Sequence, residues 1–324
     1  MSEQTKPAST GNGTLHKSKI GGQALIEGIM MKGPLKGAMA CRLPDGTIDL
    51  EVWNEKNGKN PPWYRKVPLV RGCVNFVLSM KDGYRCLMKS AEKQVEEDED
   101  EEPLSRFEQW MTDKFGDKIM NAMMTVSLIF SVVLAFLLFL YLPKWTVGLV
   151  APLTQNHIIR SIAEGLVKIL LFVGYMALTA RMKDIRRTYE YHGAEHKTIA
   201  FHEAHLPLTV ENIQKQTRFH PRCGTSFIFI VLIIGIFASC FIPRSFVVWQ
   251  RVLCSLAMLP LVMGISYEFI RLAGRYTNPV TRALSFPGLQ MQRITTREPD
   301  AKQIEVAIAA ITPCIPEDLE EDNW

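Results

Sequence analysis

The feature that most constrains this chain is a stretch of 21 residues, Ala122 to Leu142, that contains no charged side chain and ends at Pro143. A helix needs about 20 apolar residues to cross the hydrocarbon core of a bilayer. The stretch therefore predicts a transmembrane helix over residues 122–142. It also excludes a fold that is soluble throughout, although 47% hydrophobic and 22% charged residues overall would suit a globular protein.

Three further segments complete a predicted four-span membrane protein. Residues 223–243 contain no charged side chain, and residues 247–268 include the uncharged run 252–267. Residues 161–180 have the length of a span but contain Glu164 and Lys168, which lie one helical turn apart and can pair. The pair fits an interfacial position near the outer end of the helix; a role in transport or proton relay is the alternative.

The distribution of Lys and Arg predicts the orientation of these spans. Residues 181–222 carry eight such side chains, whereas residues 143–160 and 244–251 carry two each. Because basic residues collect on the cytoplasmic side, we expect a protein of the cell (inner) membrane, in contact with the lipid bilayer, with both termini cytoplasmic. The polar residues 1–20 lack the apolar core of a signal peptide, so insertion is expected to depend on the internal spans.

The predicted cytoplasmic parts combine into a small α+β domain on a predominantly α membrane protein. Its pieces are the N-terminal region 20–95, the His- and Cys-rich loop 181–222 and the C-terminal region 269–324. Outside it we expect a disordered basic tail (1–19) and an acidic linker (96–105), because strongly charged, weakly apolar segments cannot build a core.

Local patterns predict elements within this domain. Pro44-Asp45-Gly46 separates two β-prone stretches and predicts a hairpin over residues 38–53. Apolar residues at helical spacing over 67–93, with basic residues alongside, indicate an amphipathic helix that rests on the membrane surface or packs against the domain. Residues 305–311 fit a short strand or a helix edge, and Thr209 is a candidate helix N-cap.

Charge and cysteine usage narrow the class of function. Lys and Arg exceed Asp and Glu by only four and are dispersed, whereas nucleic-acid binding needs a concentrated basic face. We therefore expect no nucleic-acid partner. The seven cysteines are irregularly spaced and suggest no disulfide framework, which favours a reducing compartment.

Four of the seven histidines lie within residues 191–205, YHGAEHKTIAFHEAH. If the helix of the second span continues into this loop, His192 and His196 share one face, with Glu195 on its flank and Glu203 on the same side. The spelling H-x-x-E-H is the inverted zincin arrangement, in which two imidazoles bind a metal ion and the Glu activates water. The motif predicts a divalent-metal site, most simply for zinc, with Glu195 as catalytic base.

A second cluster supplies further candidate ligands. His220 and Cys223 stand at H-x-x-C spacing in a turn before the third span, and zinc favours imidazole together with thiolate. With His192 and His196 they could form one tetrahedral site, which would be structural with four protein ligands and catalytic with a water in place of one. The alternative is that the histidines are hydrogen-bonding residues near the membrane and Cys223 is a small turn residue.

Other polar residues are candidates for supporting roles. Glu203 lies about 10 Å along the helix from His196, too far to share one ion without a bend, and suits an outer layer or a second ion. Glu211 could place a carboxylate at the site, although the helix dipole commonly explains a Glu in a first turn. Gln23 and Glu27, in an apolar segment with glycines at both ends, could face a cleft or serve packing; the segment lacks the spelling of a phosphate-binding loop.

Six motifs in order give the chain a resemblance to a known family. They are GGQALIEGIMMKGP (21–34), RG (71–72), YHGAEHK (191–197), LTVEN (208–212), HPRCGTSF (220–227) and PGLQMQRITTREPD (287–300). Together they resemble the YqhQ-like bacterial membrane proteins, the family with domain of unknown function 1385. Members are regarded as multi-span proteins and described as predicted metal-dependent enzymes without an established reaction.

The resemblance implies roles for the residues at the family's polar motif positions. These positions are His192, Glu195, His196, Glu203, Glu211, Asn212, His220 and Cys223. The resemblance also makes Gln23, Glu27, Arg42 and Arg71 stronger candidates than their local spacing does.

Two classes of function follow. In the first, the protein is a membrane-anchored metal-dependent enzyme, hydrolase-like and of unknown substrate, in which Arg71 and Arg222 hold an anionic group. In the second, it is a non-catalytic membrane scaffold or regulator with a structural zinc. A transporter is a weaker third choice, and the oligomeric state is left open. Three protein ligands beside an open fourth position would favour the enzyme, and four in a buried site would favour the scaffold.

Overall fold

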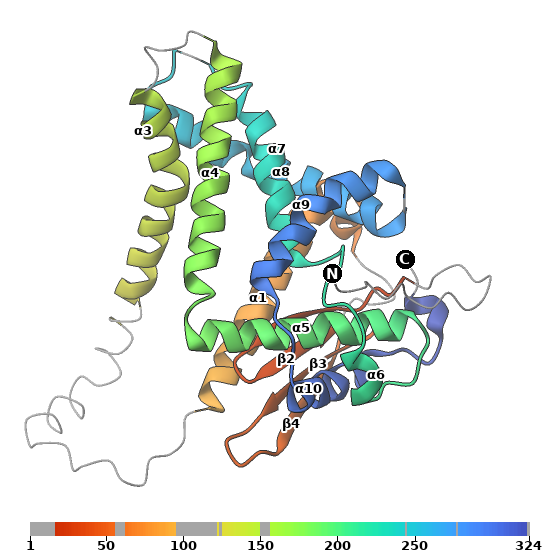
Figure 1. Cartoon of the computed structure of the whole chain (residues 1–324). Coiled ribbons are helices and arrows are strands. Elements are labelled where there is room, and N and C mark those ends of the chain that lie inside the picture. The colour runs from red at the N-terminus through yellow and green to blue at the C-terminus, as the bar shows by residue number, and fades with distance from the viewer. Residues whose placement is uncertain are drawn as a thin grey trace, which may run out of the picture.

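The computed structural model describes residues 17–55, 62–94, 122, 125–149, 156–243, 245–276 and 278–322, which are mostly helical with one small sheet (Figure 1). The predicted acidic linker and nearly all of the predicted tail lie outside these residues. The strands are β1 (Gly21–Leu25), β2 (Gly28–Lys32), β3 (Lys36–Arg42) and β4 (Ile48–Asn54). The helices are α1 (Val70–Glu92), α3 (Leu142–Leu149), α4 (His157–Thr179), α5 (Lys183–Glu203), α6 (Val210–Gln214), α7 (Gly224–Ser239), α8 (Val248–Arg275), α9 (Pro279–Thr295) and α10 (Ala301–Ile311), with short helical turns at η1 (Trp63–Arg65), η2 (Leu137–Tyr141), η4 (Thr312–Cys314) and η5 (Leu319–Asp322).

Three helices among the described residues are long and apolar enough to cross a membrane. They are Thr125–Leu149, which includes η2 and α3, Ile158–Thr179 within α4, and Val248–Arg275, which is α8. They correspond to the predicted spans 122–142, 161–180 and 247–268. The helix α7 is equally apolar but has 16 residues, short of the roughly 20 that a straight span needs. A fourth span over 223–243 therefore stays a prediction.

Two helix ends differ from the predicted boundaries, and proline bears on both. The helix α7 ends at Ser239 instead of residue 243, and a turn follows it up to Pro243. This agrees with the rule that the residue before a proline disfavours helical geometry. The first span instead continues through Pro143 to Leu149. Directly before Pro143 the backbone forms the π-helical turn η2, which accommodates the missing N–H of the proline and the bulk of its ring.

A buried ion-pair network joins the three candidate spans. The fully buried carboxylate of Glu164 on α4 accepts hydrogen bonds from Lys144 of α3 at 2.6 Å, from Lys168 at 2.7 Å and from Arg251 of α8 at 2.8 Å. The predicted Glu164–Lys168 pair is confirmed, with two further cations from other helices. Because a buried charge is costly unless it is paired, this network stabilises one arrangement of the three helices.

The sheet is a four-stranded antiparallel meander in the order β1-β2-β3-β4. The hairpin predicted around Pro44-Asp45-Gly46 is confirmed, because Arg42 of β3 lies opposite Ile48 of β4. The segment over residues 21–32 forms a second hairpin, β1–β2, in which Leu25 pairs with Gly28 across a two-residue turn.

The sheet is covered on both faces. One core, shared with α5 and α10, contains Ile29, Met31, Ala38, Ala40, Tyr191, Ile304 and Ile311. The other core, shared with α1, contains Leu25, Met30, Met39, Cys41 and Cys86. Consecutive residues of β2 and β3 point to opposite faces, as the two-residue period of a strand requires. The amphipathic helix predicted over 67–93 is thus α1, which packs against both the sheet and α8, and residues 305–311 belong to the helix α10.

The second span does not continue as one helix into the His-rich loop. The helix α4 ends at Thr179, the chain turns at residues 180–182, and α5 begins at Lys183. Figure 1 shows that α5 starts below the lower end of α4, turns sharply away from it and runs along the sheet. In this direction α5 buries ten residues, of which Tyr191, Ala194, Ile199 and Phe201 belong to the core shared with the sheet and α10. Because residues 183–203 are nevertheless helical, His192, Glu195 and His196 keep the predicted helical spacing.

Candidate metal site

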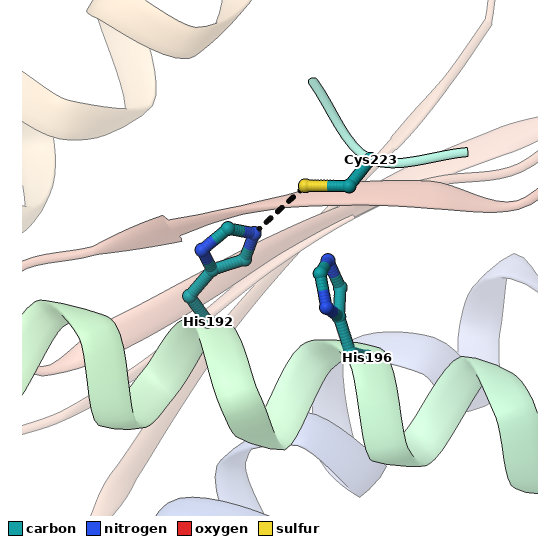
Figure 2. Close-up of side chains that lie close together, drawn as sticks. All are labelled: His192, His196 and Cys223. Atoms are coloured by element: carbon teal, nitrogen blue, oxygen red, sulfur yellow. Dashed lines mark hydrogen bonds between the residues drawn. The ribbon is translucent and has the colours of Figure 1, made fainter. Parts of the chain in front are cut away.

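His192 and His196 of α5 converge on Cys223, which directly precedes α7 (Figure 2). One ligand atom from each residue lies within 4.8 Å of the other two. The Nε2 atom of His192 is 3.2 Å from Sγ of Cys223, and the two imidazole centroids are 4.4 Å apart. Zinc bonds of about 2.0 Å to nitrogen and 2.3 Å to sulfur place ligand atoms of one tetrahedral ion roughly 3 to 4 Å apart. The cluster therefore has close to the dimensions of a metal site.

Both imidazoles are held in the tautomer that a metal ion requires. Nδ1 of His192 lies 2.8 Å from the carbonyl oxygen of Thr295, and Nδ1 of His196 lies 2.7 Å from the carbonyl oxygen of Arg218. Since a carbonyl can only accept, both Nδ1 atoms must carry the proton and donate. When the ring is neutral, its Nε2 is therefore the lone-pair atom that can bind a metal ion. Carbonyl groups commonly orient metal-binding histidines in this way.

Cys223 lies where a thiolate is stabilised. It is the N-cap of α7, and its sulfur accepts the N–H of Thr225, so it sits at the positive end of the helix dipole. Burial by itself would raise the pKa of this thiol, but the imidazoles of His192 and His196 outweigh burial and hold the pKa well below its usual value. The same contact raises the pKa of His192 against the effect of burial. The proton shared by His192 and Cys223 therefore resides on the imidazole, and the sulfur is a thiolate.

Glu195 lies beside the cluster and is almost completely buried, and its Oε2 atom has no hydrogen-bond partner. Burial raises the pKa of this carboxyl, against the opposing effects of His192, His196 and a hydrogen bond from the backbone of Gly22. A Cβ atom at Gly22 would lie 2.7 Å from the oxygen of Met30 and 3.0 Å from Cδ of Glu195. Glycine at this position of β1 thus permits the close approach of the strand to the carboxylate.

His220 lies next to this group but does not complete it. Its ring centroid is 5.6 Å from that of His196, and its Nε2 is 3.7 Å from Glu203. Gln292 of α9 holds its backbone on both sides, at 2.8 Å to the N–H and 2.7 Å to the carbonyl. Burial lowers the pKa of His220 to about 4, so the ring is neutral at physiological pH. The structure thus assembles three of the four predicted ligands.

A cavity of about 130 Å³ opens beside these residues. It is lined by Ser18, Lys19, Ile20, Gly21, Gly22, Glu195, His196, Ile199, His220, Arg222, Cys223 and Gly224. Glu203 braces its edge, because its carboxylate binds Arg222 and accepts the N–H of Ser18 at 2.8 Å. Ser18 and Lys19 are tied in turn to Asp322, which also bonds His202 at 2.9 Å. Two segments distant in the sequence therefore close the wall of the cavity.

The other predicted candidates do not line this cavity. In the β1–β2 hairpin, Gln23 packs against Gly83 of α1, and Glu27 pairs with Arg187 and Tyr191 of α5. Arg42 bonds Glu305 of α10 at 2.7 Å, and Arg71 forms a two-pronged ion pair with Glu268 that fastens α1 to α8. Glu211 and Asn212 belong to the short helix α6, where Glu211 is exposed. In the structure Gln23 therefore serves packing, and Glu27, Arg42 and Arg71 form ion pairs.

Several site groups lay outside the sequence prediction. The carbonyls of Thr295 and Arg218 orient the imidazoles, and a backbone carbonyl leaves no trace in residue spacing. Gln292 and Thr295 belong to the motif over 287–300, which carried part of the family resemblance but suggested no role. Ser18 and Asp322 reach the site only through tertiary folding.

Comparison with known proteins gives a family without an assigned activity. Residues 67–317 match the family described as "Protein of unknown function (DUF1385)". The "Uncharacterized protein YqhQ" of Bacillus subtilis (strain 168) is 34% identical over 309 residues, which cover 94% of each chain. No solved structure matches the chain. The chemistry of the site therefore has to be inferred from its own geometry.

Proposed function

The chain belongs to the DUF1385 family, as its six motifs predicted, and we propose that it is a multi-pass membrane protein that binds a divalent metal ion at His192, His196 and Cys223. We further propose a hydrolase-like reaction in which Glu195 is the general base. Zinc is the expected ion, because imidazole and thiolate together form a donor set that zinc favours.

One observation carries the proposal: two imidazoles, each anchored by a carbonyl through Nδ1, present Nε2 toward one thiol beside a carboxylate oxygen without a partner. A buried carboxylate oxygen without a partner is costly, so the residues present fit an additional bound group. A structural zinc normally has four protein ligands, whereas here Nε2 of His220 lies 3.4 Å from Nη2 of Arg222 and a cavity lies beside the other three residues. The arrangement supports a catalytic site over a scaffold.

When bound, the metal would supply Lewis acidity and lower the pKa of a water molecule toward neutrality. Glu195 is the group of this chain placed to take up the proton. Its pKa, raised by burial, brings the carboxyl closer to the range in which a side chain can accept and return a proton near pH 7. The distribution of basic residues supports a site that faces the cytoplasm of a cell (inner) membrane.

The test separates the base from the ligands. Glu195→Gln preserves shape and removes the base, so the variant should remain folded, inserted and metal-loaded but lose its ability to complement a deletion strain. His196→Ala should lose the metal as well. Glu92→Gln, which alters an exposed carboxylate at the end of α1, is the matched control and should behave as wild type. Metal content and complementation are measured on the same variants.

The alternative, a scaffold with a structural zinc, makes the opposite prediction for the base. A Glu195→Gln protein that complements fully would rule out hydrolysis through this residue and leave the structural role. A wild-type protein that purifies without metal and takes up none would refute the proposal altogether.

A further inference from the structure

We infer that the substrate of this site carries a small oxyanion, a carboxylate or a phosphate, and that the Arg222 guanidinium binds it beside the metal ligands. The inference rests on the proposed function and names its substrate class. Sequence reasoning offered both Arg71 and Arg222 for such a role. Arg71 is bound in two-pronged fashion to Glu268 on α8, whereas Arg222 lines the cavity that contains Glu195, His196 and Cys223.

The guanidinium of Arg222 has a buried hydrogen-bond donor that is not paired. Its side chain is 10% exposed, and its Nη2 atom binds Glu203, but its Nη1 atom is buried without a hydrogen-bond partner. A guanidinium presents five N–H donors in a rigid planar fork that matches the oxygens of a carboxylate or phosphate. Since buried donors in folded proteins are almost always paired, an unpaired Nη1 in a cavity wall indicates a group that the protein receives from outside.

The guanidinium is also held in position before any ligand arrives. Glu203 fixes one edge and is itself held by the N–H of Ser18. The aliphatic part of Arg222 packs against Gly274 of α8, where a Cβ atom would lie 2.9 Å from Cδ of the arginine. A pre-positioned fork loses little conformational freedom on binding, which is the property expected of a substrate-orienting group.

The rest of the cavity also favours an anion. Gly224, the first residue of the 16-residue helix α7, lines it, so the positive end of that helix dipole faces the same space. The carboxylate of Glu203 is already paired with Arg222, which limits the negative charge opposing an incoming oxyanion. The volume of about 130 Å³ suits a small group such as a carboxylate or a phosphate.

The experiment uses the full-length protein in detergent, with Co²⁺ at the site as a spectroscopic substitute for zinc. Sodium acetate and inorganic phosphate are titrated separately at constant ionic strength, and the visible spectrum of Co²⁺ reports on the site. At least one anion should change the wild-type spectrum saturably. The anion that binds more tightly identifies the substrate group as carboxylate or phosphate.

Three variants test whether Arg222 is responsible for the binding of the anion. Arg222→Lys keeps a cation for Glu203 but removes the planar fork, and it should weaken anion binding at least tenfold while keeping the Co²⁺ spectrum. The double variant Glu203→Gln/Arg222→Gln removes both charges, leaves no buried carboxylate unpaired and should weaken binding further. Lys215→Gln, which removes an exposed cation of the same loop, is the control and should bind within twofold of wild type.

The outcomes separate this inference from the proposed function. If Co²⁺ gives no thiolate-ligated spectrum in the wild type, the metal site is refuted and the inference falls with it. If Co²⁺ binds but neither anion changes its spectrum, or the Arg222 variants bind the anion as tightly as wild type, the metal site stands and the role of Arg222 is overturned.

Discussion

Cys223 combines three contacts in one thiol: it caps α7, it bonds His192, and it lies within ligand distance of His196. A cysteine at a helix N-terminus next to imidazoles is a thiolate in preference to a thiol. The other buried cysteines differ, because burial raises the pKa values of Cys41 and Cys314 to about 12. The chain therefore contains one thiol prepared for a metal among several that are inert.

This contrast predicts selective alkylation of the metal-free protein. The thiolate is the reacting form, and a lowered pKa keeps Cys223 in that form at pH 7, whereas Cys41 and Cys314 remain protonated there. Iodoacetamide at pH 7 should modify Cys223 and spare the other two, as read by peptide mass spectrometry. Saturating zinc should slow the reaction at Cys223 at least tenfold. An unchanged rate in the presence of zinc would contradict a zinc–sulfur bond.

At this scale, the sequence supports predictions only about side chains. The spacing of His192, Glu195 and His196 follows from the geometry of any helix, and Cys223 follows from donor chemistry. The sequence could not exclude His220 from the set of metal ligands, because the position of this residue depends on contacts with Gln292 and Glu203. Nor could it provide the Thr295 and Arg218 carbonyls, which become orienting groups only after distant segments pack together.

Among the elements, the β1–β2 hairpin shows where local signals fail. The hairpin over residues 38–53 carried a Pro-Asp-Gly turn, but β1 and β2 are joined by Ile26 and Glu27, which resemble no turn signal. Glu27 adopts a left-handed backbone with φ of 48°, a conformation that favours glycine or asparagine. Its ion pair with Arg187 and its hydrogen bond to Tyr191 fix it there from α5. Tertiary contacts thus replace the missing turn residue.

The contact between α5 and the segment after α9 gives a prediction at the element scale. A Cβ atom at Gly193 would overlap the carbonyl oxygen of Arg297, a backbone group with little freedom to move. Gly193→Ala should therefore push α5 away from residues 295–297 and loosen the hold of Thr295 on His192. We expect a loss of about 1–3 kcal/mol in the free energy of unfolding. Zinc affinity should fall roughly 10- to 100-fold, as when an outer-layer partner is lost.

Gly174→Ala in α4 is the matched control, because a Cβ atom there meets nothing within 4 Å. It should leave zinc affinity unchanged and alter thermal stability little, since alanine suits a helix better than glycine. Thermal unfolding and zinc titration of the purified variants provide the comparison. Equal zinc affinity in Gly193→Ala and wild type would show that the α5 contact does not tune the site.

For the whole molecule, the metal-site cluster and the Glu164 network lie toward opposite ends of α4. Glu164 is in the second turn of that helix, whereas α5, with both histidines, begins four residues after the helix ends at Thr179. The positions of three spans follow from hydropathy alone. The assembly of the sheet, α5 and α10 into one domain does not, because it joins residues that are far apart in the sequence.

The orientation of the molecule is a prediction that labelling can decide. Eight basic residues over 181–222, against two in each flanking segment, place the metal-site end in the cytoplasm and Asn156 outside. In a cysteine-depleted background that keeps Cys223, a reporter thiol at Asn156 should react with an impermeant maleimide added to intact cells. A reporter at Gln214, which is exposed on α6, should react only after the cells are opened. The reverse pattern would invert the topology.

The hydrogen bond between Ser18 and Asp322 determines when, during synthesis, the site can be completed. These two side chains meet across 304 positions of sequence, and both Ser18 and Lys19 depend on Asp322 for their placement in the cavity wall. During synthesis, His192, His196 and Cys223 leave the ribosome well before residue 322 does. The proposed ligands are therefore synthesised before the pocket can be completed, and the site can mature only after translation has passed Asp322.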